Sequence, residues 1–129
     1  MTLEFEILVP DGIVIQTRVV KLRAADATGQ FGLLPGHEAF VTLLSPCVLL
    51  FCDENGCERY AAADGGVLVS ERHHVSVATR EAVTADQLEQ VAGAAAAMLE
   101  TRQRRERTAK AEFAQLQTSL LRELRKLEK

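Results

Sequence analysis

Apolar and polar residues follow two different periodicities along the chain, and the change between them falls near Thr84. Over residues 2–9 they alternate one by one, which is typical of a strand with one buried face. Six further stretches are rich in apolar and β-branched residues, namely 20–24, 40–44, 48–52, 59–63, 67–70 and 75–79. Turn signals separate these stretches, among them Pro35-Gly36, Ser45-Pro46 and Asp64-Gly65-Gly66. The pattern predicts an all-β sandwich or barrel up to about residue 84.

Beyond Thr84 the apolar residues recur at helical spacing. The segment TADQ at residues 84–87 fits a capping box, in which a hydroxyl and a Gln side chain satisfy backbone N–H groups. Two apolar stripes follow, separated by the wholly polar segment 101–107. The first contains Leu88, Val91, Ala95, Met98 and Leu99, and the second contains Phe113, Leu116, Leu120, Leu124 and Leu127. We expect a helical hairpin that turns within residues 100–109, with one long helix as the alternative because no Gly or Pro marks a turn there.

Composition and charge exclude several classes of function. The chain has 129 residues, a net charge of −3 and no Trp, so nucleic acid is not expected as a partner. Acidic residues exceed basic ones up to residue 97 and basic residues exceed acidic ones afterwards, which suggests different partners for the two parts. No apolar run reaches the roughly 20 residues of a membrane-spanning helix. The first residues do not resemble a secretory signal.

Candidate catalytic and metal-binding residues are few. Cys47, Cys52 and Cys57 form no C-x-x-C pair, so we interpret them as reduced thiols. His73 and His74 are adjacent and would point to opposite faces of a strand, which disfavours a shared metal ion. The sequence contains neither a nucleophile elbow nor a P-loop. We therefore expect no catalytic residue, no metal and no cofactor.

The run from Gly29 to Thr42, GQFGLLPGHEAFVT, resembles the signature of the epsilon subunit of F-type ATP synthases, G-x-[FL]-G-[IL]-x-P-G-H-x-x-[FL]-[LV]-T. Companion motifs stand in the family's order at residues 10–12 (PDG), 19–24 (VVKLRA), 63–68 (ADGGVL) and 75–82 (VSVATREA). The resemblance implies a ten-stranded β-sandwich domain over residues 1–84, followed by a two-helix hairpin domain over residues 85–129.

The resemblance also implies a function. The family's subunit is not catalytic and lies in the rotor, bound to the gamma subunit and to the polar loops of the membrane c-ring. It couples the catalytic head to the membrane ring, and in many bacterial members its helices inhibit ATP hydrolysis by contacting the catalytic beta and alpha subunits. We therefore expect a peripheral protein on the cytoplasmic side of the bacterial inner membrane, in a synthase driven by protons or sodium ions.

Three groups of site residues follow from the family's motif positions. The residues expected to face the ring are Gln30, Phe31, Leu34 and His37. From the residues alone, an exposed Phe31 and a Phe31 buried in the core are equally compatible with the sequence. Those expected near gamma are Asp64, Gly65 and Gly66, which from sequence alone form a tight hairpin turn. The expected inhibitory arm consists of basic residues that suit an acidic partner, namely Arg102, Arg104, Arg105, Arg107, Arg122, Arg125 and Lys126.

Some bacterial epsilon subunits bind ATP through the motif [IL]-D-x-x-R-A at the start of the first helix. The matching segment here is LEQVAG at residues 88–93, with Ala92 where the Arg would be and Gly93 where the Ala would be, so we expect no ATP binding or only very weak binding. Two other functions are compatible with the residues alone. One is a free-standing β-sandwich sensor of a small molecule with a helical signalling arm, and the other is a small hydrolase that uses His37 and a cysteine.

Overall fold

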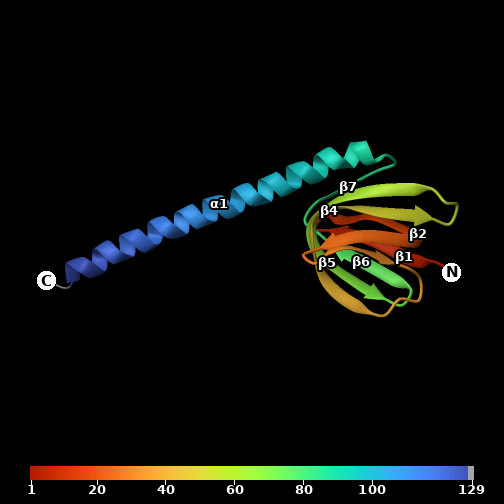
Figure 1. The fold of residues 1–129 in the computed structure, drawn as a ribbon, viewed down its shortest axis with the longest axis horizontal. Helices are drawn as coiled ribbons and strands as arrows, with labels where there is room; N and C mark the ends of the chain where they lie inside the picture. Colours follow the sequence, from red (N-terminus) through yellow and green to blue (C-terminus); the bar gives the residue numbers. More distant parts are fainter. Residues whose placement is uncertain (128–129) are drawn as a thin grey trace. The chain divides into compact units, whose positions relative to one another are not determined.

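The computed structural model describes residues 1–127, and within them there are seven strands and one helix (Figure 1). The strands are β1 (Leu3–Val9), β2 (Gly12–Asp26), β3 (Gly29–Leu33), β4 (Phe40–Asp53), β5 (Glu58–Glu71), β6 (His74–Ala78) and β7 (Ala82–Ala85). The helix is α1 (Leu88–Leu127).

The strands form one sheet that closes on itself. Its order is β1-β6-β5-β4-β2-β3, with β7 added beside β5, and β1 also pairs with β2. The β1–β6 pair is parallel and the other pairs are antiparallel. Because β1 joins both β2 and β6, only the short strands β3 and β7 are attached along one side. The result is a barrel-like β-sandwich, as the alternating pattern predicted.

Residues 1–127 contain seven strands and not the expected ten, and two of the expected turns lie inside strands. Residues 40–44 and 48–52 belong to the single strand β4, and residues 59–63 and 67–70 belong to β5. Pro46 pairs with Asp64 and Leu44 pairs with Gly66, so the irregular positions of the two strands face each other. Both strands therefore bend at the same point and the pairing continues on either side.

The core of the sandwich consists of the inward-facing residues of these strands. Phe5 and Phe51 are both buried, and their ring centroids are 5.1 Å apart in a tilted arrangement. Each fully buried side chain of this size stabilises the fold by about 1.5–3 kcal/mol relative to an exposed one. The other buried members are Leu3, Ile7, Val19, Leu22, Ala24, Leu33, Leu44, Leu49, Ala61, Ala63, Leu68, Val75 and Val77.

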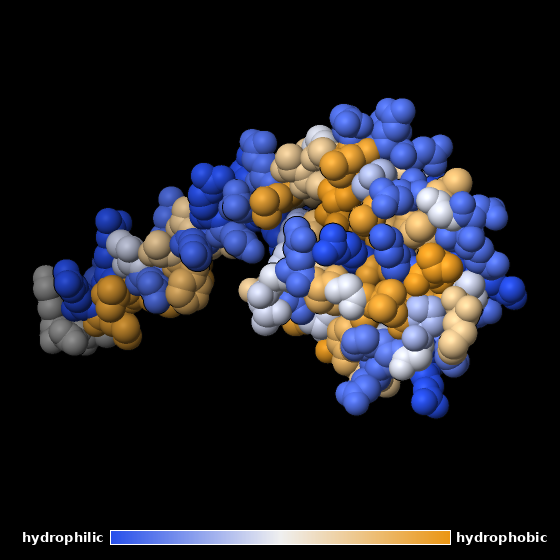
Figure 2. Space-filling view, turned by 45° about the vertical axis from the view of Figure 1, so that its right-hand side comes forward, coloured by the Kyte–Doolittle hydropathy of each residue, from blue (hydrophilic) through white to orange (hydrophobic). Residues whose placement is uncertain are grey.

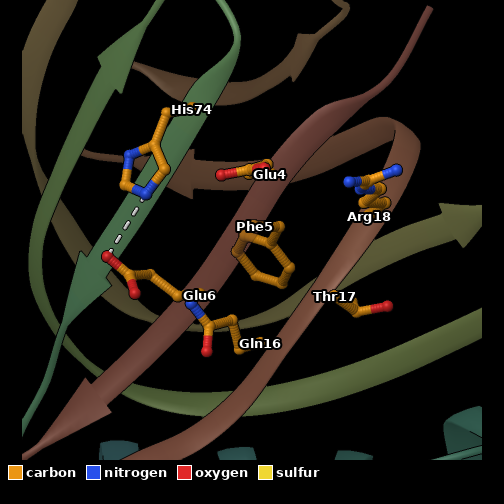
Figure 3. A pocket seen from close by; sticks show the side chains of 7 residues that line it. All are labelled: Glu4, Phe5, Glu6, Gln16, Thr17, Arg18 and His74. Atoms are coloured by element: carbon orange, nitrogen blue, oxygen red, sulfur yellow. Dashed lines mark ion pairs between the residues drawn. The ribbon is translucent and has the colours of Figure 1, made fainter.

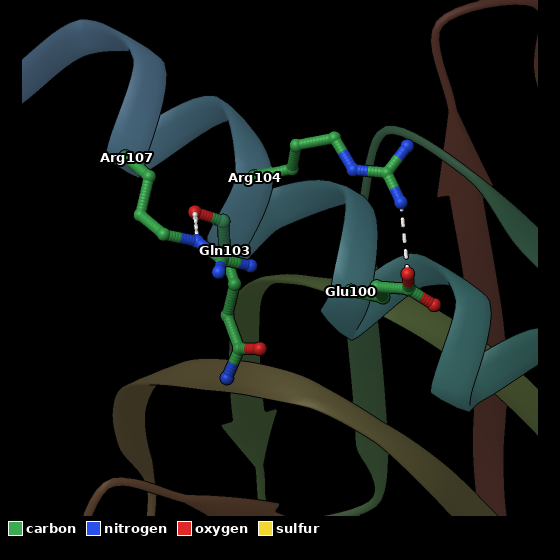
Figure 4. A network of polar contacts seen from close by, with 4 residues as sticks. All are labelled: Glu100, Gln103, Arg104 and Arg107. Carbon is green, nitrogen blue, oxygen red and sulfur yellow. Dashed lines mark hydrogen bonds and ion pairs between the residues drawn. The ribbon is translucent and has the colours of Figure 1, made fainter. Parts of the chain in front are cut away.

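The expected helical hairpin is also wrong, and the alternative of one long helix is correct. Helix α1 runs without a break for 40 residues, through the whole segment where a turn was expected. Ion pairs spaced four residues apart support it there. Arg104 Nη2 lies 2.8 Å from Glu100 Oε1 (Figure 4). Arg102 Nε lies 3.9 Å from Glu106 Oε1. Such pairs stabilise a helix, so the absence of apolar residues from 101–107 does not mark a turn.

The chain divides into two compact units, one ending at Leu99 and the other beginning at Glu100. Within the first unit, Val91 and Met98 of α1 are buried together with Ala62 of β5. The Arg59 guanidinium lies 3.3 Å from the Asp86 carboxylate just before the helix. The first three turns of α1 thus share a small apolar cluster with the sandwich. Thr84, which was expected to cap the helix, lies instead in β7 opposite Ala61.

Candidate functional site

The residues expected to face the ring lie on β3 and on the turn that follows it. Gln30 and Phe31 pair with Ala25 and Ala24 of β2, so the strand fixes their positions. Gln30 is exposed, whereas Phe31 is half-buried against the core. Leu34 is 59% exposed, which is unusual for a large apolar side chain next to a buried core. The turn therefore presents Leu34 outward, as a surface for another molecule would.

Phe40 holds these residues together, although the sequence analysis did not assign it a role. Its ring centroid lies 5.9 Å from that of Phe31 and 5.6 Å from that of His37, both in edge-to-face arrangements. The His37 N–H donates to the Leu34 carbonyl at 3.2 Å, and the ring Nδ1 lies 3.0 Å from the Glu38 carbonyl oxygen. The signal was available, because Phe40 belongs to the same signature as Phe31 and His37, and neighbouring aromatic rings favour edge-to-face contacts.

An apolar patch continues from this site along β4 and β5. Val41 is 66% exposed and Leu43 is 72% exposed, and they pair across the strands with Val69 and Val67. We call Val41, Leu43, Val67 and Val69 the valine patch. The face of the strand-built part seen in Figure 2 shows hydrophobic side chains at the surface between hydrophilic ones. Exposed β-branched and leucine side chains in neighbouring strands are typical of a protein interface.

A polar contact fixes the edge of the valine patch. The Asp26 carboxylate accepts hydrogen bonds from the hydroxyl and the N–H of Thr28 and from the hydroxyl of Thr42, the last at 2.8 Å. The hydroxyl of Thr28, then that of Thr42, lowers the pKa of Asp26 below its ordinary value because these donors stabilise the charged form. The turn between β2 and β3 is thereby tied to β4 beside Val41.

Asp64, Gly65 and Gly66 lie within β5 and do not form the hairpin turn that the sequence suggested. Gly65 is buried, and the Asp64 N–H donates to the Glu81 carbonyl at 3.1 Å. Gly66 has a φ of 115°, and a Cβ atom there would lie 2.0 Å from the Ala78 carbonyl oxygen. The glycines therefore allow β5 to bend while β6 passes very close to it.

The basic residues expected in the inhibitory arm all lie on α1 and are exposed. We call residues 100–127 the arm. Three of its basic residues have acidic neighbours on the same helix, since Lys126 Nζ lies 3.6 Å from Glu123 Oε1 and Arg102 and Arg104 are paired as described above. Arg107 donates instead to the Gln103 carbonyl at 3.4 Å (Figure 4). Arg105, Arg122 and Arg125 form no ion pair with any residue that the structure describes.

The arm also carries an apolar stripe that its own unit leaves uncovered. Phe113, Leu116, Leu120 and Leu124 are between 56% and 63% exposed. Leu127, the last member predicted for this stripe, has a side chain that lies outside the described part. An isolated helix gains little stability from such a stripe, so the stripe is suited to burial against another surface.

A second, polar surface lies across β1, β2 and β6 (Figure 3). His74 and Arg18 are the cross-strand neighbours of Glu4 on either side, and the His74 ring lies 3.4 Å from the Glu6 carboxylate. Together with Gln16, these side chains line a shallow depression. Among residues 1–127 no group of three His, Cys, Asp or Glu side chains could hold a metal ion.

The cysteines are unpaired thiols in three different surroundings, since Cys52 is buried, Cys47 half-buried and Cys57 exposed. Burial raises the pKa of the Cys47 thiol above its ordinary value, because desolvation disfavours the thiolate. Desolvation, followed by the charge of Glu58, likewise raises the pKa of Tyr60. A raised thiol pKa is the opposite of what a nucleophilic cysteine requires.

Comparison with known proteins accounts for this arrangement. Residues 2–85 match the family model described as the ATP synthase, Delta/Epsilon chain, beta-sandwich domain. The ATP synthase epsilon chain 2 of Paraburkholderia xenovorans is 37% identical over 129 residues, covering 95% of this chain and 90% of that protein. The chain belongs to the ATP synthase epsilon chain family. It is thus the non-catalytic epsilon subunit of the rotor's central stalk.

Two further matches cover a smaller share of the related proteins. The epsilon chain of Acinetobacter baumannii (strain ATCC 17978) is 41% identical over 88 residues, which is 68% of this chain and 60% of that epsilon chain. A chain in the cryo-EM structure of the Euglena gracilis mitochondrial ATP synthase, OSCP/F1/c-ring, matches with a TM-score of 0.62 and 26% identity. That match covers 72% of this chain and 61% of the Euglena chain.

The family signature coincides with the site described above. It begins at Gly29 in β3, includes the exposed turn with Leu34 and His37, and ends at Thr42 in β4. Within residues 1–127 the only long helix, α1, is too polar to cross a membrane. The epsilon chain presents its signature as a partly apolar surface.

Proposed function

We propose that this epsilon chain docks on the polar loops of the membrane c-ring through Gln30, Phe31, Leu34 and His37. The observation that carries the proposal is the exposed Leu34 in the same segment as the edge-to-face rings of Phe31, Phe40 and His37. A rigid frame that exposes a large apolar side chain suits protein contact and the transfer of force. The c-ring named with the Euglena neighbour supports this partner. The proposal places the chain on the cytoplasmic side of the bacterial inner membrane.

The gamma subunit is the proposed partner of the outer side of the β4–β5 pair. Asp64, Gly65 and Gly66 lie within β5, and Gly66 pairs with Leu44, next to the Leu43–Val67 pair of the valine patch. Since Gly65 is buried, gamma would contact the apolar side chains of the valine patch and the backbone at the bend. The two proposed docking surfaces adjoin, because the ring-facing turn leads directly into Phe40 and Val41.

A third part of the proposal concerns inhibition of ATP hydrolysis by the arm. Its exposed basic residues suit acidic surfaces of the catalytic beta and alpha subunits, and its apolar stripe would be buried in the same contact. The test is a chain truncated after Leu99, which keeps Val91 and Met98 in place. We expect faster ATP hydrolysis by the assembled synthase with the truncated chain, and an unchanged rate would remove the inhibitory role.

The docking surfaces are tested with matched substitutions of exposed apolar residues. In reconstituted synthase, Leu34→Asp should strongly reduce ATP-driven ion pumping while ATP hydrolysis continues, because a carboxylate replaces the apolar contact with the ring. Ile13→Asp is the control, since Ile13 is 58% exposed but lies at the β1–β2 turn, away from the signature. Equal pumping by the Leu34→Asp and Ile13→Asp proteins would contradict the proposal.

A further inference from the structure

The turn between β5 and β6 is joined to the signature turn by a backbone hydrogen bond. The Gly36 N–H donates to the Arg72 carbonyl at 2.9 Å. The next residue of the same turn is fixed as well, because the Glu4 N–H donates to the His73 carbonyl at 2.8 Å. Two segments that are far apart in the sequence therefore form one continuous surface. We call Leu34, His37, Arg72 and His73 the two-turn surface.

The two-turn surface contains a cation that the fold does not neutralise. The Arg72 side chain is exposed and forms no ion pair with any of residues 1–127. Gln30, on β3 ahead of the signature turn, is neutral. The acidic residues Glu38 and Glu71 belong to the same segments, and neither is paired with Arg72. The unpaired guanidinium of Arg72, in a segment whose backbone is bonded to the turn that carries Leu34, is therefore available to a partner.

We propose that Arg72 is a specificity-determining contact of the ring-facing surface and binds a carboxylate on the ring loop that covers Leu34. The proposal rests on the proposed function, since it assumes that the signature turn meets the ring. A guanidinium can hold a carboxylate through two parallel N–H···O bonds, which fixes the orientation as well as the affinity. The backbone bond to Gly36 holds the Arg72 main chain in place relative to Leu34, so one acidic loop can engage both side chains.

The first experiment measures binding of the full-length chain to the detergent-purified cognate ring at low and high salt. Arg72→Glu should weaken binding about tenfold or more at low salt, because a like charge then meets the carboxylate. The difference should shrink at high salt, where charges are screened. Arg80→Glu is the control, since Arg80 is exposed and unpaired within the described chain but lies beyond the other end of β6.

Leu34→Asp in the same assay separates this inference from the proposed function. If Leu34→Asp weakens binding and Arg72→Glu does not, the role of Arg72 is wrong and ring docking stands. If neither substitution weakens binding, ring docking through the signature is wrong as well. An equal effect of Arg80→Glu would also overturn the role of Arg72, because the effect would then come from net charge alone.

The second experiment identifies the carboxylate chemically. In the complex of the Arg72→Lys chain with the ring, a water-soluble carbodiimide should couple the new amine to the partner carboxylate, with loss of water taken up by the reagent. Mass spectrometry should then find a ring peptide joined at position 72, and none joined at position 80 in the Arg80→Lys control. A stable complex without the position-72 product would overturn the proposed carboxylate.

Discussion

Phe5 in the sandwich and Phe113 in the arm are both phenylalanines, but one is buried and the other is exposed. Phe5 is fully buried in the sandwich, where its ring packs on Phe51. Phe113 lies in the arm and is 62% exposed, as are its neighbours Leu116 and Leu120 to a similar degree. The sandwich buries the apolar residues of its inner face within itself, whereas the stripe of the arm gains burial only against another surface. The strand-built unit is therefore a self-sufficient frame, and the arm is a binding element.

The largest test of this contrast substitutes the two phenylalanines in turn. Phe5→Ala should lower the free energy of unfolding of the sandwich by about 3–5 kcal/mol, because it leaves a cavity in the core. Phe113→Ala should change it by less than about 0.5 kcal/mol, because an exposed residue loses little burial. Urea unfolding of the isolated chain, followed by a probe of the sandwich, measures both. A comparable cost at both positions would show that the stripe of the arm is covered by the chain itself.

A second test addresses the bend at which β4 and β5 turn together. Gly66→Ala should destabilise the sandwich by about 2–4 kcal/mol, because its Cβ would meet the Ala78 carbonyl and its backbone is in the left-handed region. Gly12→Ala is the control, since Gly12 also has a positive φ but no atom within 4 Å of the added Cβ. Thermal unfolding compares the two. Equal costs would mean that close strand packing contributes nothing at the bend.

This bend also shows what the sequence alone could and could not predict. The positions of strands followed from alternation, because one buried face forces a period of two. The chemistry of Pro46 and Gly66, however, is the same for a turn as for a bend within a strand. Only the register, which pairs Leu44 with Gly66 and Pro46 with Asp64, distinguishes them, and the register is a long-range property.

The candidate site residues could be selected from the sequence only where they lie close together in the chain. The signature selects Gln30, Phe31, Leu34 and His37 in this way, and their contact with the ring stays a prediction. Arg72 could not be selected, because its link to Gly36 is a backbone hydrogen bond between distant segments, which leaves no mark on side-chain identity. The unbroken helix was kept only as an alternative, because a polar segment between two apolar stripes fits either a turn or a solvated helix with internal ion pairs.

A third and smaller test locates the boundary between the two parts of α1. Val91→Ala should loosen the contact of the first turns with Ala62 and cost about 2 kcal/mol, since it removes buried methyl groups. Alanine favours the helix more than valine does, so lost helix propensity does not explain such a cost. Hydrogen exchange should show faster exchange in residues 88–99 and unchanged exchange in the strands. Val83→Ala, at a more exposed site in β7, is the control, and slower or unchanged exchange in residues 88–99 would contradict the shared cluster.

The smallest expected effect is a gain, not a loss, in the free energy of unfolding, and it concerns a buried polar group in the sandwich. Ser70 is buried in β5 between Phe40 and Val75, and its Oγ has no hydrogen-bond partner among the residues that the structure describes. Removing an unsatisfied buried hydroxyl avoids its desolvation cost, so Ser70→Ala should raise the free energy of unfolding by about 1 kcal/mol. Ser76→Ala, at a half-buried position of β6, should change it by less than about 0.5 kcal/mol in the same denaturant titration. A loss of stability in the Ser70→Ala protein would mean that Oγ is hydrogen-bonded in solution.

Ser70 pairs directly with Phe40, which contacts two of the proposed ring-facing residues. If the Ser70→Ala protein gains stability and still binds the c-ring, the sandwich beneath the proposed docking surface does not depend on this hydroxyl.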